Sequence, residues 1–320
     1  MASSNSTFTE MVTTSLRNHA KKLVDNVTDH NGLLRKLKEN GNIQTKSGGY
    51  EIVFPLEYAE NGTYQRYSGF DQLDVAASDV FTAAKYDWAQ VAIHVTASGR
   101  EIRMNNGPEQ MIDLVKARVK NAMNTAANNF SVDLYGSGAL TNQIGGLGLI
   151  VTSDGTGTVG GINSATDTFW ANQFYENPGT GFATTSVGAS FNTMWLRCVR
   201  GNDKPDLVVC SNDLYSIYEA SLQSNQRYMS ADKASLGFNE LMYKTAQVIF
   251  DSNTNFGTTA EIGYFLNTKY LYVVEHSEAK WTQDDDKVPV NQDAVVIPIY
   301  WMGNMVCTNR SLQGKLIDVS

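Results

Sequence analysis

One long amphipathic segment, residues 108–134, constrains the fold of this chain more than any other feature. Its apolar side chains recur at steps of three and four residues, at Met111, Val115, Val119, Met123, Ala126, Phe130 and Leu134. This spacing predicts a single helix about 40 Å long, at ~1.5 Å per residue. An Asn-Asn-Gly-Pro sequence favours a helix start at residue 108, and glycines at 136 and 138 favour its end. A helix of this length with one apolar stripe is typical of a brace along a flat sheet, although an ordinary enzyme domain can carry one on its surface.

Composition and charge narrow the class of protein. The 320 residues are 42% hydrophobic, which is enough for a folded core, and the length predicts two lobes. The formal net charge of −8 argues against a dedicated nucleic-acid binder, which would carry a basic excess. Only 18% of the residues are charged, while Asn, Thr, Ser and Gly are abundant. This mixture suits a protein whose surface is covered by other protein, and it also fits a β-rich secreted domain.

The cysteines and the absence of long apolar runs bear on location. Cys198, Cys210 and Cys307 have no CxxC or metal-ligand spacing, so we expect neither a disulfide framework nor a structural zinc site, and folding in a reducing compartment. The N-terminus has no apolar signal core, and no run approaches about 18 apolar residues. We therefore expect a protein without an export signal and without a membrane partner.

The first 46 residues are interpreted as a helical arm. Apolar side chains at helical spacing mark two short amphipathic pieces, and basic residues outnumber acidic ones. Such an arm can follow phosphates, dock on an acidic neighbour or simply be solvated. The residues that could face phosphates are Lys21, Lys22, Arg35, Lys36 and Lys38.

Residues 47–104 form a long β excursion. Residues 50–54 alternate like a strand, Pro55 places that strand at an edge, and Asn61-Gly62 indicates a hairpin turn. Residues 85–96 form the returning strand. We expect no helix to cover this excursion, and an isolated two-stranded hairpin is marginally stable in water. Its aromatic side chains should therefore pack on another copy of the chain, and the candidates are Tyr50, Phe54, Tyr64, Tyr67, Phe70 and Trp88.

The remainder of the chain alternates between helices and strands and then becomes mostly strand. Between residues 148 and 262 the pattern predicts helices at 167–175, 191–200 and 212–222, and strands at 205–210 and 247–250. From residue 263 onward it predicts strands at 264–266, 271–275, 295–301 and 305–309. The last two strands are expected to lie against the long helix.

No segment carries a convincing catalytic or cofactor signature. Residues 155–160 match G-x-G-x-x-G, but no helix pattern starts at the glycines and no acidic residue closes a second strand, so we expect a flexible glycine loop. The aspartates at 284–286 lack the spacing of a calcium loop and are expected to form a solvated turn. The four histidines are scattered and no G-x-S-x-G elbow occurs. We therefore expect no enzyme activity, no cofactor and no metal.

The order of these parts resembles the major capsid proteins of tailed phages of the Hong Kong 97 type. The local matches are residues 81–103, similar to the strand that returns from the extended loop; residues 108–134, similar to the spine helix; residues 135–138 with Gly146-Leu147, similar to the glycine pattern after that helix; and residues 205–211, similar to a strand of the axial domain. The resemblance implies an α+β fold with an N-terminal arm at 1–46, an extended β loop at 47–104, a spine helix and first peripheral part at 105–147, an axial domain at 148–262, and closing peripheral strands at 263–320.

The same resemblance implies a function and partners. It implies a shell protein that forms hexamers and pentamers, closes into an icosahedral head around double-stranded DNA, and contacts that DNA weakly and non-specifically. It further implies a portal, a separate scaffolding protein or a very short internal one, assembly in the host cytoplasm, and a final location in the virion.

Three alternatives stay open at this point. An encapsulin-like compartment would share the architecture and enclose enzymes rather than a genome. A nucleotide-binding enzyme would use the 155–160 glycine loop. A tail or adhesin β-protein would form trimers or fibres instead of shells.

Overall fold

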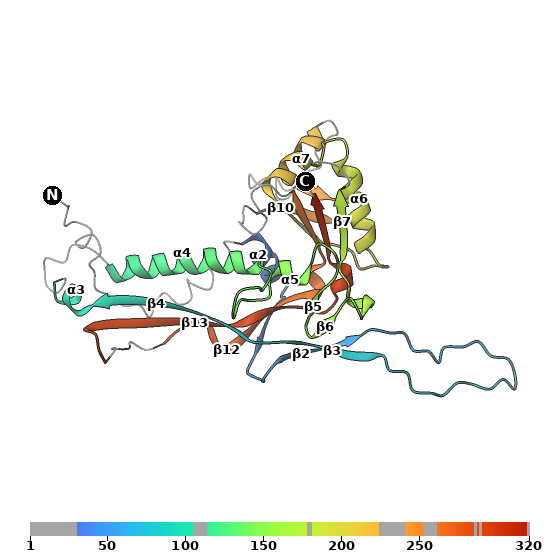
Figure 1. The fold of residues 1–320 in the computed structure, drawn as a ribbon, viewed down its shortest axis with the longest axis horizontal. Helices are drawn as coiled ribbons and strands as arrows, with labels where there is room; N and C mark the ends of the chain where they lie inside the picture. Colours follow the sequence, from blue (N-terminus) through green and yellow to red (C-terminus); the bar gives the residue numbers. More distant parts are fainter. Residues whose placement is uncertain are drawn as a thin grey trace.

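The computed structural model describes residues 31–104, 114–177, 181–223, 241–251, 261–284, 287 and 290–318. The molecule is elongated (Figure 1), with a long helix lying along one sheet, a second lobe rising beside the end of that helix, and a thin ribbon projecting beyond both. Within the described residues no helix is both long enough and apolar enough to cross a membrane.

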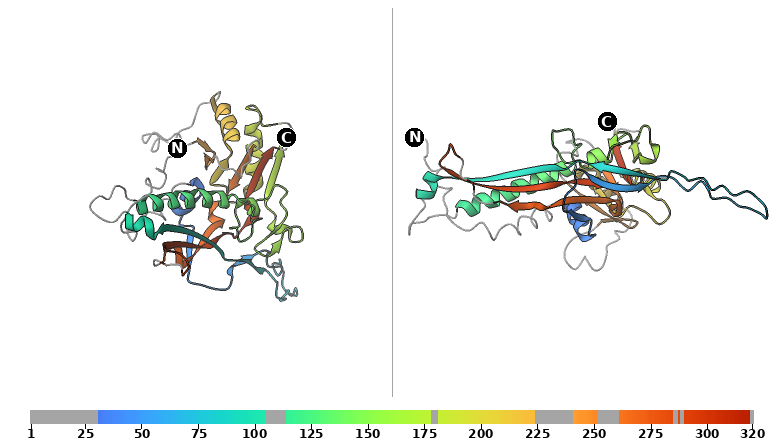
Figure 2. Two further views of the ribbon diagram at one scale, coloured as in Figure 1. Left: turned by 60° about the vertical axis from the view of Figure 1, so that its left-hand side comes forward. Right: turned by 90° about the horizontal axis from the view of Figure 1, so that it is seen from below.

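The first sheet has four strands in the order β1-β12-β13-β4. Its long members are β12 (Leu271–Gln283), β13 (Ala294–Cys307) and β4 (Ala89–Ser98), and β13 pairs antiparallel with both of the others. These strands run along the same axis as the projecting ribbon when seen from below (Figure 2). The short strand β1 (Ile43–Lys46) lies parallel to β12 at the edge.

The long helix α4 (Leu114–Leu134) braces this sheet. Its Phe130 ring meets Trp301 of β13 edge to face at 4.7 Å and Trp281 of β12 at 5.6 Å, and all three rings are buried. The predicted brace and the predicted end at Leu134 are therefore confirmed, and the predicted start at residue 108 lies outside the described residues. The expectation that no helix covers the β excursion is wrong for β4, because α4 packs against that strand.

The second sheet has six strands in the order β7-β14-β11-β8-β10-β9. The ranges are β7 (Gln173–Asn177), β14 (Gly314–Asp318), β11 (Ile262–Leu266), β8 (Leu207–Cys210), β10 (Ala246–Phe250) and β9 (Leu241–Tyr243). Helices α6 (Val187–Cys198) and α7 (Asn212–Gln223) pack on it around Phe191, whose ring stacks on Tyr218 at 4.8 Å and meets Phe265 at 5.2 Å. The predicted helices and strands at 191–222 and 247–250 are confirmed to within a few residues.

Two predictions for the chain after residue 148 are wrong. Residues 167–175 are not a helix: a 3-10 turn (Thr168–Trp170) leads into β7, because the buried Trp170 indole donates to the carbonyl of Val159 and β7 completes the sheet beside β14. The two strands expected at 295–301 and 305–309 are one strand, β13. Gly303 lets it continue there, since a Cβ at this position would lie 2.3 Å from the carbonyl oxygen of Val274. The expectation that this part of the chain lies against the long helix is confirmed, since β13 belongs to the sheet beside α4, while β11 and β14 belong to the six-stranded sheet.

The end of the expected arm is part of the folded body. Helix α2 (Gly32–Glu39) starts at Asn31, whose side-chain oxygen accepts from the amides of Leu33 (2.8 Å) and Leu34 (3.2 Å). Leu33, Leu34 and Leu37 are buried, and β1 follows directly in the first sheet. The division of the chain into domains stays a prediction, but a free arm can extend only over residues before 31, which lie outside the described part.

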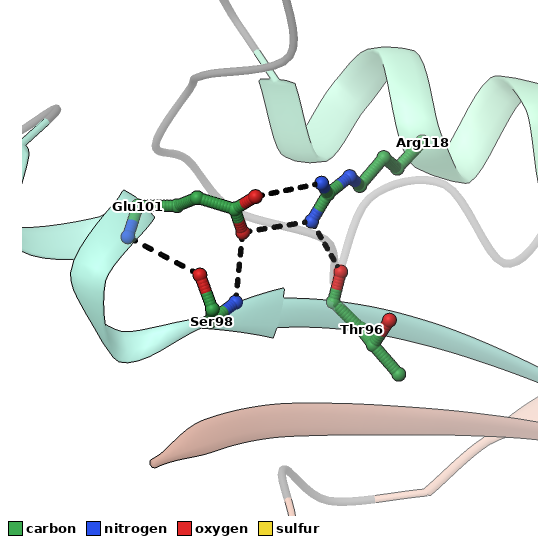
Figure 3. A network of polar contacts seen from close by, with 4 residues as sticks. All are labelled: Thr96, Ser98, Glu101 and Arg118. Carbon is green, nitrogen blue, oxygen red and sulfur yellow. Dashed lines mark hydrogen bonds and ion pairs between the residues drawn. The ribbon is translucent and has the colours of Figure 1, made fainter. Parts of the chain in front are cut away.

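The far end of the first sheet is joined to α4 by a compact polar network (Figure 3). Helix α3 (Gly99–Met104) follows β4 and carries Glu101, whose two carboxylate oxygens each lie 3.2 Å from a guanidinium nitrogen of Arg118 on α4. Arg118 also donates to the carbonyl of Thr96, and Glu101 accepts from the amide of Ser98 at 2.8 Å. Burial alone would raise the pKa of Glu101, but the hydrogen bonds from Arg118 and Ser98 outweigh it and hold the pKa below its usual range.

This network predicts a pH-dependent contribution to stability. The folded pKa of Glu101 is below the unfolded value of about 4.3, so the contribution is complete above that value and is lost as pH falls through the folded pKa. We expect E101Q to lower the free energy of unfolding by about 1–2 kcal/mol at pH 7, and the difference from wild type to shrink on acidification. Urea unfolding of both proteins between pH 7 and pH 3 measures this.

A nearby ion pair provides the matched control. Arg103 and Asp293 approach to 2.9 Å in the same region, but their side chains are 73% and 64% exposed. D293N should therefore change the free energy of unfolding by less than ~0.5 kcal/mol at any pH. Equal effects of E101Q and D293N would contradict the assignment.

Candidate assembly surface

The projecting ribbon is built on a two-stranded sheet. Strands β2 (Ile52–Glu57) and β3 (Phe81–Tyr86) pair antiparallel from Ile52↔Tyr86 to Glu57↔Phe81. Pro55 lies in β2, which pairs only with β3, so its missing amide costs no ladder bond and the predicted edge position is confirmed. Residues 58–80 continue from the two strands as a pair of extended limbs (Figures 1 and 2).

The chain reverses at the far tip of these limbs. The amide of Ser68 donates to the Asp71 carboxylate at 2.8 Å, the amide of Asp71 donates back to the Ser68 carbonyl at 3.2 Å, and Gly69 between them has φ +58°. Asn61-Gly62, the predicted hairpin turn, is instead part of the outgoing limb, so that prediction is wrong. Asn61 forms a local turn there, accepting from the amide of Thr63, and its side chain also accepts from the Ser78 hydroxyl across the ribbon.

The ribbon exposes large aromatic rings. Phe70 at the tip is fully exposed, Tyr64 and Tyr67 are 82% and 66% exposed, and Tyr50 at the root is 95% exposed. Isolated exposed apolar residues are ordinary, but several on one thin extension are typical of a surface that binds another protein. Over residues 57–80 five carboxylates accompany one guanidinium, a net charge of −4, and the acidic residues are Glu57, Glu60, Asp71, Asp74 and Asp79.

Phe54 and Trp88 differ from these four residues. Phe54 stacks on Tyr272 of β12 at 5.9 Å, with the Lys46 ammonium 4.2 Å from its ring centroid. The Trp88 indole donates to the carbonyl of Gly49 at 2.9 Å and meets His276 edge to face. Their own chain therefore already covers these two rings partly, and their contact with another copy stays a prediction.

The basic candidates fall in two groups. Lys21 and Lys22 lie outside the described residues. On α2, Arg35 and Lys38 are exposed and Lys36 is half-buried, on the side of the helix away from its buried leucines. These side chains are not gathered at the ribbon, so the two sets of candidates occupy different parts of the molecule.

The glycine motif at 155–160 forms a β-hairpin and not a nucleotide loop. Strands β5 (Thr158–Val159) and β6 (Ile162–Asn163) are joined by Gly160 and Gly161, whose φ values are +60° and +77°. A dinucleotide loop presents amides at the start of a helix. Here no helix follows, and the carbonyls of Thr156 and Gly157 face the buried guanidinium of Arg310. The expectation of a flexible loop is also wrong, since this cation holds the loop in place.

The remaining candidates for chemistry form no metal-binding cluster within the described part of the chain. Asp284 pairs with Lys287, and residues 285 and 286 lie outside the described part. Among the described residues no three His, Cys, Asp or Glu side chains come together as metal ligands do. Cys198, Cys210 and Cys307 are all buried thiols, and burial raises the pKa of Cys198 and of Cys307 to about 12.

Comparison with known proteins bears on the fold. No protein-family model matches the sequence, and no curated protein matches it with significant similarity. Among solved structures, the capsid of cyanophage A-1(L) is similar over 87% of this chain and 89% of its own, with a TM-score of 0.64 and 16% identity. The capsid of the Myoviridae phage XM1 is similar over 88% and 92%, with a TM-score of 0.58 and 12% identity. The chain has the Hong Kong 97-type capsid fold.

The capsid fold gives each element a recognised place. Helix α4 is the spine helix, the sheet beside it is the peripheral sheet, the six-stranded sheet with α6 and α7 is the axial part, and β2 with β3 carries the extended loop. The α+β class and the order of parts predicted from the sequence are confirmed. The holo-SrpI encapsulin complex of Synechococcus elongatus is also similar, over 87% of this chain and 86% of its own, with a TM-score of 0.57 and 6% identity.

Proposed function

We propose that this chain is the major capsid protein of a tailed bacteriophage, which self-assembles into the icosahedral head that encloses double-stranded DNA. The observation that carries the proposal is the ribbon, which holds three exposed aromatic rings away from the body of a chain with the capsid fold. Tyr and Phe side chains bury about 150–250 Å² each when they are covered, and such residues dominate protein interfaces. A second copy of the chain is the partner that would always be present.

Self-association through the ribbon explains how a modest contact could build a shell. Each copy would give its ribbon to one neighbour and receive the ribbon of another, a head-to-tail contact that closes into rings when the rotation allows it. Hexamers and pentamers are such rings, and several contacts per copy make the assembly cooperative. The acidic ribbon also disfavours stacking of ribbon on ribbon, since like charges repel.

The other partners follow from the same proposal. Packaged DNA would meet the shell through weak, non-specific contacts, and the exposed Arg35 and Lys38, with Lys36 and the preceding Lys21 and Lys22, are the candidates for its inner face. An overall charge of −8 would keep these contacts weak enough for packing and release. A portal and a separate scaffolding protein complete the proposed assembly, which would take place in the host cytoplasm and end in the virion.

An encapsulin-like compartment is the second candidate, favoured by the structural likeness to the SrpI encapsulin. The two candidates differ in their contents. Particles that carry double-stranded DNA support the phage head, and particles that carry an enzyme and no genome support the compartment.

Electron microscopy of the purified full-length chain tests the proposal. We expect closed shells of uniform diameter, together with a mass by analytical ultracentrifugation of many subunits. A folded monomer that persists at high protein concentration, with the ribbon packed on its own body, would overturn it.

A further inference from the structure

The glycine hairpin β5–β6 abuts the root of the ribbon (Figure 1). The amide of Lys85 in β3 donates to the carbonyl of Gly160 at 2.9 Å. In a two-stranded sheet each strand has one edge without a partner strand, and this bond occupies that edge of β3. The hairpin therefore acts as a support on the side of the ribbon that β2 leaves open.

The contact is too close for any residue but glycine at position 160. A Cβ there would lie 2.9 Å from the Cβ of Ala84 and 3.1 Å from the ring of Tyr86, both buried residues of β3. Carbon atoms in contact prefer about 3.5–4.0 Å. Gly161, the next residue, has the same left-handed backbone but no atom within 4 Å of a Cβ built on it. Of these two glycines, only Gly160 is at a position where an added Cβ would meet the ribbon.

The support is itself held by Arg310, which follows β13 and is fully buried. Its guanidinium donates to the carbonyl of Thr156 at 2.9 Å and to the hydroxyls of Ser164 and Thr152 at 3.0 Å each, and its Nε donates to the carbonyl of Ile150. These bonds fix the hairpin from both of its ends, because Thr156 precedes β5 and Ser164 follows β6.

The same segment also holds β3 directly. The Tyr86 hydroxyl donates to the carbonyl of Cys307 at 2.8 Å and accepts from the amide of Cys307 at 3.3 Å. Cys307 ends β13, three residues before Arg310. Residues 307–310 therefore hold the root of the ribbon in two ways. Cys307 bonds directly to Tyr86 of β3, and Arg310 holds the hairpin that contacts β3.

We propose that Gly160 is a positioning residue that sets the direction in which the ribbon leaves the body. The hairpin β5–β6, which Arg310 holds in place, is the support that carries Gly160. The tip of the ribbon lies far from this support. Fifteen residues separate Ala84 from Gly69 at the tip, so the distance between them is at most about 50 Å, at ~3.3 Å per residue. A small change in the direction of β3 beside the hairpin would displace the tip by a larger distance, because the tip lies far from this point. In the proposed shell, where the ribbon joins neighbours, this direction would set the angle between subunits.

A distance measurement within one subunit tests the proposal. Nitroxide labels on S68C at the ribbon tip and A189C on the exposed side of α6 report the direction of the ribbon by double electron–electron resonance. The native thiols should resist labelling because they are buried. Mixing labelled with unlabelled full-length protein removes distances between subunits.

We expect G160A to shift or broaden the distance distribution and G161A to leave it as in wild type. Both variants place alanine at a positive φ, so the contact with β3 is the main difference between them. Amide exchange at Lys85 should quicken in G160A only. Equal behaviour of the two variants, whether both unchanged or both shifted, would overturn the proposal.

A second pair of variants approaches the contact from the ribbon side, in case G160A is recovered only as aggregate. A84V enlarges the residue that touches Gly160, and A83V enlarges its neighbour, which points to the opposite face of β3. Only A84V should shift the distance, and an unshifted A84V would overturn the proposal. The distance concerns one subunit, so it is informative even if the chain forms no shells. If it does form them, G160A should give shells of altered or irregular curvature.

Discussion

Replacing Arg310 by methionine should destabilise the subunit by about 3–5 kcal/mol, the largest single-residue effect that we expect outside the apolar core. The side chain is fully buried, and none of the ion pairs in the described part of the chain involves it. Burial lowers the pKa of Arg310, yet an arginine stays protonated in a folded protein. Its hydrogen bonds therefore go to carbonyl and hydroxyl oxygens, and the Asp154 carboxylate adds an electrostatic attraction without forming an ion pair.

The expected loss comes from the oxygens that remain after the substitution. Methionine fills most of the volume but donates nothing to the carbonyls of Ile150 and Thr156 or to the hydroxyl of Ser164. Each buried acceptor left without a donor costs about 1–3 kcal/mol. R310K should also be destabilising, because one ammonium cannot span oxygens that the planar guanidinium reaches from three nitrogens.

Thermal unfolding of the variants measures this effect. A loss of 3–5 kcal/mol lowers the Tm by roughly 10 °C in a protein of this size. R200M is the matched control, since Arg200 is an exposed arginine of a surface turn, and its Tm should stay within ~2 °C of wild type. An R310M protein with the wild-type Tm would show that the guanidinium is not holding the hairpin.

The sequence predicts the parts of this fold whose signals are local. The stripe that ends at Leu134 predicts α4 because its described members Val119, Met123, Ala126, Phe130 and Leu134 are all buried. The run 205–210 predicts β8 because its residues form a short continuous apolar run, the pattern of a strand buried on both faces. All four residues of β8 are buried. The exposed rings of Tyr64, Tyr67 and Phe70 could be identified because no neighbouring segment has the length or pattern to cover them.

The features of the fold that could not be predicted depend on hydrogen-bonding and strand-pairing partners that are distant in the sequence. Nothing in Thr308-Asn309-Arg310 distinguishes a buried arginine, since its acceptors lie about 150 residues earlier in the chain. The prediction of one returning strand at 85–96 is wrong: the chain forms β3 and then β4, because β3 pairs with β2 and β4 pairs with β13. Likewise, β11 and β14 have ordinary strand patterns, and only their pairing with β8 and β7 places them in the second sheet.

The hairpin at the root of the ribbon has a local sequence signal. Two consecutive glycines at 160 and 161 between short β-branched or polar residues are typical of a tight hairpin turn, in which both central residues have positive φ. The same residues also match G-x-G-x-x-G, a pattern typical of phosphate binding. A strand after the motif, where a helix is required, is the feature that separates the two interpretations.

Replacing Tyr64, Tyr67 and Phe70 together by serine should abolish assembly while leaving the subunit folded. The three rings are 66% exposed or more, so their removal costs the isolated subunit almost nothing. In the proposed shell each ring would be covered by a neighbour, at about 1.5–3 kcal/mol per ring. The sum of about 5 kcal/mol per contact weakens association by more than ~1,000-fold.

Sedimentation and thermal unfolding separate the two halves of this prediction. The variant should sediment as small species at concentrations where wild type forms shells, and its Tm in the unassembled state should match that of wild type. L196S removes an apolar side chain that is 62% exposed on α6, away from the ribbon, and should leave assembly intact. If the triple variant builds shells at the wild-type concentration, the contacts that hold the shell together lie elsewhere on the molecule. The ribbon would then be a consequence of the fold and not the means by which copies join, because exposed rings that contribute no binding energy cannot hold an assembly together.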